Sequence, residues 1–330
     1  MKSSPSAATE NRAPGLVYVA PGRAEIRDVP LGEGECLLEM RVSALSRGTE
    51  RLVFEGRVPE SEHERMRAPF QRGDFPFPVE HGYCAVAEVL EGPPELVGRL
   101  VFALHPHRTR FRLPASACLP LPEGLPPERA ALAANMETAL NAVWDAGLAP
   151  GDRVAVVGAG LLGCLVARLA ARLPGASVFL TDGNASRKAA AHHLGANFRE
   201  PGALPDDCDV ALNASASSSG LAAALASLGP EGRCVELSWH GDRPVTLPLG
   251  GAFHSRRLSI VSSQVGSLPP VRAPRWSHRR RLETALALLA EDPTLDDLID
   301  VEVPFADLPA RLPELLAPDA PGVATIVRYA

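Results

Sequence analysis

A glycine pattern follows a short apolar run near the middle of the chain. Gly158-Ala159-Gly160-Leu161-Leu162-Gly163 comes directly after Val154–Val157, and it opens the apolar run Leu161–Leu173. A strand, a tight glycine turn and a helix in this order form a cradle for phosphate groups. The first glycine allows the turn, the second lets the backbone approach a pyrophosphate, and the third lets the helix pack closely on the strand. The pattern therefore predicts a dinucleotide-binding loop, with contacts from Gly158, Gly160, Leu161, Leu162 and Gly163.

An acidic residue closes the next apolar run. Asp182 ends the segment Phe179-Leu180-Thr181-Asp182, about 20 residues beyond the glycines, where an acid accepts hydrogen bonds from a ribose diol. Because this carboxylate repels a 2′-phosphate, the expected cofactor is NAD. NADP stays open, since Arg187 and Lys188 follow within two turns. The alternative for Asp182 is a plain turn in which it caps the following helix.

Two glutamates are candidates for proton transfer. Glu50 lies in Ser46-Arg47-Gly48-Thr49-Glu50, and Glu137 lies in Asn135-Met136-Glu137-Thr138. A buried carboxyl group has a raised pKa and can exchange a proton near neutral pH. For each of them the alternative is an ion pair, with Arg47 as a partner.

Histidines and arginines add further candidates. His105 and His107 are two residues apart on an extended segment, so both could face one substrate or metal, and an ordinary polar loop is the alternative. His81 is interpreted as structural or pocket-lining. The basic clusters 256–257 and 279–281 are typical of a solvated helix face, or of a clamp for an acidic substrate.

The elements that must position these residues follow two kinds of sequence pattern. The first third is β-rich, with short runs separated by glycine and proline, at 16–20, 35–44, 84–90 and 100–104. A helical stretch, 130–146, comes next, and strands then alternate with helices. The strands are expected at 153–158, 177–182, 209–214, 233–239 and 258–264. The helices are expected at 161–173, 185–194 and 220–228. Such alternation predicts a parallel sheet, because parallel strands need crossover helices. A basic linker, 271–281, a helix, 282–290, and short strands at 300–303 and 323–329 follow.

Composition limits the function classes. The chain has 330 residues and a formal net charge of -6, which argues against a general nucleic-acid binder. No run of about 18 apolar residues predicts a membrane span. Six scattered cysteines without CxxC spacing fit a reducing compartment, so we expect a cytoplasmic protein. Residues 1–15 are interpreted as a disordered leader.

Together with their flanks, these residues resemble the medium-chain dehydrogenase/reductase superfamily, the zinc-type alcohol dehydrogenase-like enzymes. The resemblance covers nearly the whole chain, and its cues are the 46–50 motif, the strand from Gly82 to Val89, the helix 139–143 and Leu194-Gly195-Ala196. The Ser-x-Gly-Thr-Glu motif looks like that of a zinc-less branch, which also resembles the bacteriochlorophyllide dehydrogenases. The resemblance implies an α/β fold, in which a GroES-like β-rich domain, 16–122 and 270–330, flanks a Rossmann doubly wound parallel-sheet domain, 123–269. It also places Thr138 near the nicotinamide.

The chain departs from that family at the zinc ligands. The positions of the three catalytic ligands carry Arg47, Tyr83 and an alanine near 134, and the cysteine-rich structural-zinc lobe is missing. A guanidinium has no lone pair to give to a metal. We therefore expect no metal. A site built from Cys84, His81 and His105 is the lesser alternative.

The resulting expectation is a zinc-independent oxidoreductase that moves a hydride between a nicotinamide cofactor and a small alcohol or carbonyl substrate. The residues expected to stabilise the substrate oxygen or move the proton are Arg47, Thr49, Glu50, Tyr83, His105 and Glu137. The alternatives are a quinone or enoyl double-bond reductase and a non-catalytic dinucleotide sensor. A homodimer is left open.

Overall fold

A computed structural model describes residues 11–329, which form two compact units. The first unit contains the residues up to 132 together with 301–320 and the segment from 325 onward, and the second contains 133–300 and 321–324. Within the described range, no helix combines the length and the apolar character needed to cross a membrane.

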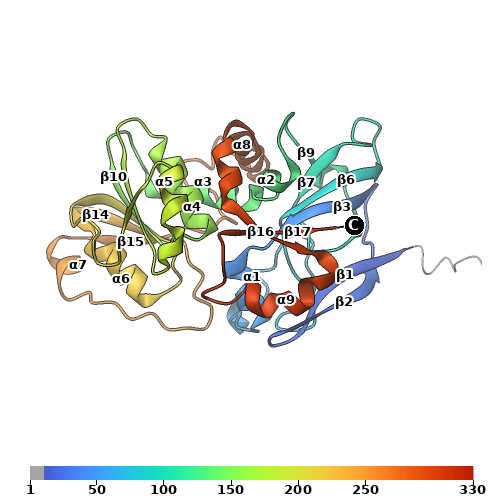
Figure 1. The fold of residues 1–330 in the computed structure, drawn as a ribbon, viewed down its shortest axis with the longest axis horizontal. Coiled ribbons are helices and arrows are strands. Elements are labelled where there is room, and N and C mark those ends of the chain that lie inside the picture. The colour runs from blue at the N-terminus through green and yellow to red at the C-terminus, as the bar shows by residue number, and fades with distance from the viewer. Residues whose placement is uncertain (1–10, 330) are drawn as a thin grey trace, which may run out of the picture. The chain divides into compact units, whose positions relative to one another are not determined.

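The first unit is built on two sheets. One has the strand order β2-β1-β5-β4, and the other has the order β16-β17-β3-β6-β7-β9, with β8 also paired to β3. The C-terminal strand β17, red in Figure 1, returns to lie antiparallel to the blue strand β3. The strands are β1 (Arg12–Ala20), β2 (Arg23–Pro30), β3 (Cys36–Ala44), β4 (Arg72–Gly73), β5 (Val79–Glu80), β6 (Ala85–Glu91), β7 (Leu100–Ala103), β8 (Arg110–Leu113), β9 (Leu119–Pro120), β16 (Ile299–Pro304) and β17 (Ala324–Arg328).

Alternation along these strands creates the core of the first unit. Leu38 and Met40 of β3 and Ala85, Ala87 and Val89 of β6 share one buried cluster, as expected of residues two apart on a pleated strand. Three α-helices of the described range pack around the sheets: α1 (Arg47–Phe54), α2 (Pro127–Ala130) and α9 (Leu308–Leu315).

The second unit is a doubly wound parallel sheet with the strand order β12-β11-β10-β13-β14-β15. This is the 3-2-1-4-5-6 order of dinucleotide-binding folds, in which ligands bind at the carboxyl ends of the strands where the order reverses. Its strands are β10 (Arg153–Val157), β11 (Ser177–Thr181), β12 (Asn197–Arg199), β13 (Cys208–Asn213), β14 (Leu228–Glu236) and β15 (Ser259–Ser262). Its α-helices are α3 (Ala133–Ala146), α4 (Leu161–Ala171), α5 (Lys188–His193), α6 (Ser218–Ala226), α7 (Ala252–Ser255) and α8 (His278–Glu291).

Helices pack against this sheet and bury it. Helix α4 contacts β10 and β11, whereas α6 contacts β10, β13 and β14. Residues Val154–Val157 of β10 are all buried, which explains their continuous apolar character. The colour of Figure 1 follows this part of the chain from green at α3 to orange at α7.

The expected α/β class is confirmed, a β-rich unit together with a Rossmann-type unit. Three details differ from the sequence interpretation. The expected leader, 1–15, is partly wrong: Arg12 to Gly15 already belong to β1, which pairs with β2, whereas residues 1–10 lie outside the described range. Residues 123–132 belong to the first unit, and residues 270–300 and 321–324 belong to the second. The second shift has a clear cause, because α8 begins at His278 and packs on α3.

Candidate functional site

The glycine loop has the geometry that its sequence predicts. Gly158 has a φ of +101°, and an added Cβ would stand 2.9 Å from the carbonyl carbon of Ala214. At Gly163 an added Cβ would stand 1.8 Å from the Gly158 carbonyl oxygen. Side chains are excluded at both positions by backbone. These two glycines therefore shape the turn itself.

Gly160 has a different role. Its added Cβ would meet only the Nη1 atom of Arg187, at 3.5 Å, so the space above it is open. Gly160 is also the N-cap of α4, and no side chain caps that end of the helix. The first-turn N–H groups of Leu161, Leu162 and Gly163 therefore stand where an anion is favoured by hydrogen bonding and by the helix dipole. This cradle fits a pyrophosphate.

Asp182 ties the end of β11 to the glycine loop. Its Oδ2 accepts a hydrogen bond from the Ala159 N–H at 2.6 Å, and its Oδ1 accepts one from the Asn184 N–H at 2.7 Å. The alternative role as a helix cap is taken by Asn184, whose side chain accepts from Ser186 N–H. A carboxylate offers about four acceptor positions, so room for a ribose hydroxyl remains. Arg187 lies 3.4 Å away through its Nη1 atom, so a cation stands beside this carboxylate.

Glu137 forms a buried ion pair. Its Oε1 accepts from Arg281 Nε at 2.9 Å, and both side chains are almost fully buried, so Glu137 forms the ion pair given as its alternative, with Arg281 in place of Arg47. Burial raises the pKa of Glu137, while the charge and hydrogen bond of Arg281 oppose that rise. Arg281 also donates to the Asn141 side chain and the Val265 carbonyl. Thr138, the next residue on α3, donates to the Ala134 carbonyl of its own helix.

In the first unit, the 46–50 motif opens helix α1 and carries Glu50 into the interior. Glu50 is fully buried and accepts three hydrogen bonds. Its Oε1 accepts from Ser46 N–H at 2.7 Å, and its Oε2 accepts from the Tyr18 hydroxyl at 2.9 Å and from His107 Nε2 at 3.1 Å. Burial would raise the pKa of Glu50, but His107 and its hydrogen bonds lower the pKa below the usual value.

His107 links Glu50 to two hydroxyl groups. Because an ionised carboxylate only accepts, His107 Nε2 carries the proton that is given to Glu50. Its Nδ1 lies 2.7 Å from Ser43 Oγ, and Ser43 Oγ lies 2.9 Å from the Tyr329 hydroxyl, so the ring and the two hydroxyl groups form one hydrogen-bonded chain. This chain ends on Glu50, which anchors the network through its three accepted hydrogen bonds.

Sequence reasoning named His107 only as the neighbour of His105. The network members Tyr18, Ser43 and Tyr329 were missed, because each comes from a separate strand or the chain end. The two-residue spacing of the histidines was the one signal that pointed here.

Tyr83 lies at the more accessible side of this cluster. Its hydroxyl donates to Ser46 Oγ at 2.6 Å, and Thr49 also hydrogen-bonds to it. Burial, followed by the nearby Cys84, raises the pKa of Tyr83 above its usual value, so the phenol keeps its proton at neutral pH. Arg47, also half-buried, donates to Thr325 Oγ1 at 2.7 Å. The structure thus brings Arg47, Thr49, Glu50 and Tyr83 together at the start of α1.

His105 does not join them. Its ring stacks on Phe111 with centroids 3.8 Å apart, it is buried, and its Nδ1 bonds the Pro106 carbonyl at 2.9 Å. A carbonyl only accepts, so Nδ1 carries the proton and the other nitrogen is an acceptor. The expectation that His105 donates to a substrate oxygen is therefore wrong in this arrangement.

His81 is a buried, neutral histidine. Its Nδ1 bonds Gln71 Oε1 at 3.2 Å, and the same oxygen accepts from Ala68 N–H, which fixes the amide orientation. Within residues 11–329 its Nε2 has no hydrogen-bond partner. Burial lowers the pKa of His81 to about 4, despite the nearby charge of Glu50.

This burial predicts a pH-dependent stability. Between pH 6.5 and about 4 the unfolded chain binds a proton at His81 that the native state does not, so stability falls as the pH falls. The integrated loss is about 3 kcal/mol, since one pKa unit corresponds to about 1.4 kcal/mol. In urea unfolding at pH 7 and pH 5, His81→Gln should show a smaller pH dependence than the wild type. His193→Gln, an exposed control, should not, and equal pH dependence in all three proteins would show that His81 titrates normally.

The lesser metal site is not formed. Among the described residues, no three His, Cys, Asp or Glu side chains group in a way that could hold a metal ion. Cys84 is fully buried, and burial followed by the charge of Glu50 raises the pKa of its thiol, so it is no thiolate at neutral pH. The alternative metal site built from Cys84, His81 and His105 is therefore wrong.

Comparisons with known proteins bear on this architecture. No protein-family model matches the chain. The chain is similar to D-guloside 3-dehydrogenase of Escherichia coli K12 and of Shigella flexneri, each 32% identical over 184 residues. The match covers 52% of this chain and 53% of each relative, so the chain spans about half the length of the curated relatives it matches.

Solved structures extend the likeness to the whole fold. L-idonate 5-dehydrogenase from Escherichia coli matches with a TM-score of 0.77 and 16% identity, over 96% of this chain and 98% of that one. Quinone oxidoreductase from Thermus thermophilus matches with a TM-score of 0.70 and 24% identity, over 96% of this chain and 99% of that one. The chain therefore has the fold of the medium-chain alcohol dehydrogenases, a GroES-like unit with a Rossmann unit.

Proposed function

We propose that this protein is a nicotinamide-dependent oxidoreductase that acts on a small alcohol or carbonyl substrate. The observation that carries the proposal is the loop 158–163, whose open Gly160, uncapped α4 and adjacent Asp182 suit a dinucleotide. Bound there, the nicotinamide cofactor would accept or supply a hydride. Gly158, Gly160, Leu161, Leu162 and Gly163 would hold its pyrophosphate. Asp182 would accept from the adenosine ribose.

The proposed cofactor is NAD, with NADP as a weaker ligand. Asp182 disfavours a 2′-phosphate, while Arg187 beside it reduces that repulsion. Thr138 is the proposed hydroxyl near the nicotinamide.

The chemistry is proposed to need no zinc, as in a zinc-less branch of the superfamily that resembles the bacteriochlorophyllide dehydrogenases. One observation supports this. Arg47 and Tyr83, at the positions that the family resemblance assigns to zinc ligands, are engaged in hydrogen bonds with Thr325 and Ser46.

In place of zinc, Tyr83 is the proposed donor to the substrate oxygen, with its one hydroxyl proton turning from Ser46 Oγ to the substrate and the Ser46 hydroxyl donating to the phenol oxygen in return. It is half-buried, carries a proton at neutral pH and is oriented by Ser46 and Thr49. Arg47 adds positive charge at the start of the same helix. Glu50 is a positioning residue, because its three accepted hydrogen bonds fix the turn that holds Arg47. Glu137 takes no proton-transfer role in this proposal.

The first substrates to test are polyols and glycosides with secondary alcohols, which the name of the D-guloside relative suggests. The likeness to a quinone oxidoreductase favours a second candidate, reduction of a quinone or an activated double bond. A dinucleotide sensor without turnover is the third. NAD-linked turnover on a panel of alcohols, carbonyls and quinones distinguishes the three.

Cofactor binding is expected to depend on Gly160. A methyl group there would fill the space of the pyrophosphate without meeting the backbone, so Gly160→Ala should fold normally and bind NADH at least about tenfold more weakly. Titrations of NADH and NADPH, followed by nicotinamide fluorescence, measure this, and NADH should bind the wild type more tightly than NADPH. Gly183→Ala is the matched control, since open space surrounds its Cβ. Equal NADH affinity in the wild type and Gly160→Ala would refute the assigned cradle.

A further inference from the structure

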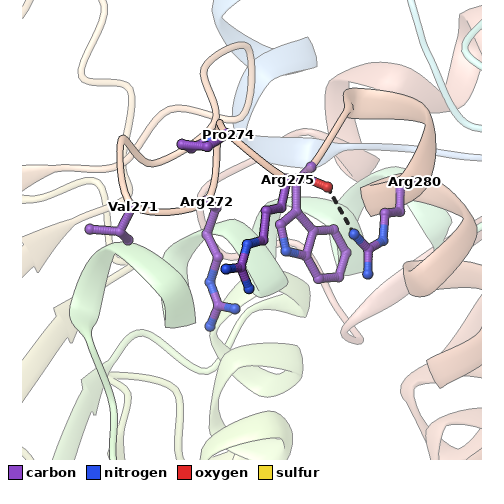
Figure 2. Close-up of a pocket in the computed structure, with 6 residues that line it drawn as sticks. Val271, Arg272, Pro274, Arg275 and Arg280 are labelled. Carbon is purple, nitrogen blue, oxygen red and sulfur yellow. Dashed lines mark hydrogen bonds between the residues drawn. The ribbon is translucent and has the colours of Figure 1, made fainter.

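A hollow rich in arginine lies on the second unit, in the segment that leads into α8. It has a volume of ≈ 540 Å³ and is lined by Val271, Arg272, Pro274, Arg275, Trp276 and Arg280. Figure 2 shows the guanidinium groups of Arg272 and Arg275 extending in the same direction from the loop. Sites for small ligands commonly measure about 300–1,000 Å³, so the hollow is large enough for one.

The positive charge of this hollow is not compensated. Arg272, Arg275 and Arg280 have no carboxylate within 4.0 Å among the residues from 11 to 329, and the sequence contains no acidic residue between Asp242 and Glu283. The neighbouring arginines differ, because Arg279 pairs with Glu283 and Arg281 with Glu137. Three unpaired guanidinium groups on a chain of net charge -6 create a local field that attracts anions.

Aromatic rings hold two of these arginines in place. The guanidinium of Arg280 lies 4.0 Å from the ring centroid of Trp276, and that of Arg272 lies 5.1 Å from the ring of Trp144. The two indoles pack against each other at 4.6 Å. Stacking occupies the face of a guanidinium and leaves its edge N–H groups available for oxyanions.

A hydrogen bond also links two of these arginines. Arg280 Nη1 donates to the Arg275 carbonyl at 2.8 Å, shown dashed in Figure 2, so the loop and the helix start are joined. A ligand would therefore meet positive groups that are already ordered, which lowers the entropic cost of binding.

We propose that this hollow binds a small polyanion, a metabolite or effector that carries several phosphate or carboxylate groups. Guanidinium groups bind both kinds of oxyanion through paired N–H donors. The charge is confined to one loop and one helix start, whereas nucleic acid needs an extended basic stripe. The proposal is independent of the oxidoreductase function.

Intrinsic fluorescence can test the site directly, because two of the three tryptophans, Trp144 and Trp276, lie at it. Inorganic tripolyphosphate and citrate, titrated at constant ionic strength, are the phosphate and carboxylate probes. At least one should give saturable quenching that weakens at higher salt. Arg275→Gln and Arg280→Gln should each weaken binding by about tenfold to a hundredfold, the usual range for a charge-assisted hydrogen bond.

Arg279→Gln is the matched control, since Arg279 lies on the same helix and is paired with Glu283. It should keep the wild-type affinity. Loss of binding confined to Arg275→Gln and Arg280→Gln also separates this site from the glycine loop, which could take tripolyphosphate too. Failure of both probes to saturate, or an equal loss in Arg279→Gln, would overturn the proposal. Far-UV circular dichroism of each variant confirms that these exposed substitutions leave the fold intact.

Discussion

Tyr83→Phe is expected to lower kcat/KM by a factor of about a hundred to ten thousand, the contribution usual for a positioned proton donor. The substitution removes only the hydroxyl that donates to Ser46 Oγ. Because Tyr83 is not one of the residues that form the glycine-loop cradle, NADH affinity should stay unchanged. Steady-state kinetics with the best substrate of the panel, together with NADH titration, measure both quantities.

Tyr18→Phe is the matched control. It removes a hydroxyl from the same cluster, but one that donates to the buried Glu50. Its expected effect is a loss of stability of about 1–3 kcal/mol, the cost of leaving a buried acceptor short of a donor. If Tyr83→Phe retained wild-type kcat/KM, the substrate oxygen would need another donor, with Arg47 as the next candidate.

Arg281→Met is expected to lower the free energy of unfolding by about 3–5 kcal/mol, the cost of removing one partner of a buried ion pair. The change leaves Glu137 buried, and it also removes the donors to Asn141 and the Val265 carbonyl. Equilibrium urea unfolding at neutral pH measures the loss. The raised pKa of Glu137 should rise further in this variant, because the opposing charge of Arg281 is gone.

Two companion variants isolate the contribution of the buried ion pair. Arg279→Gln breaks an exposed ion pair with Glu283 on the same helix, and it should cost at most about 1 kcal/mol. The double variant Glu137→Gln/Arg281→Met should recover part of the stability, since no charge is then buried alone. A loss below about 1 kcal/mol in Arg281→Met would show that the buried pair is not stabilising.

The Rossmann unit was predictable because its signals are local. The run before Gly158, the glycine spacing and Asp182 all lie within about 30 residues, the length of a strand–helix–strand unit. Strand β12, only Asn197–Arg199, escaped prediction, because three residues carry no recognisable pattern. The sequence places helix α8 in the wrong unit. Its start is rich in arginine, as an exposed segment would be, but Arg281 is buried and pairs with Glu137 of the second unit.

The cluster around Glu50 could be predicted only in part. The motif 46–50 is contiguous in sequence, so Arg47, Thr49 and Glu50 were named together. Its partners come from β1, β3 and the end of the chain, and strand pairing alone brings Tyr18, Ser43 and Tyr329 to them. The choice between His105 and His107 likewise depended on which ring stacks on Phe111, a packing detail with no sequence signature.

The most direct test of the central proposal, hydride transfer with a nicotinamide cofactor and without zinc, is NAD-linked turnover before and after dialysis against a chelator. Zinc in the same samples is determined by elemental analysis. We expect turnover that the chelator leaves unchanged and zinc far below one equivalent per chain. One equivalent of zinc that leaves together with the activity, and restores the activity when it is returned, would contradict the proposal.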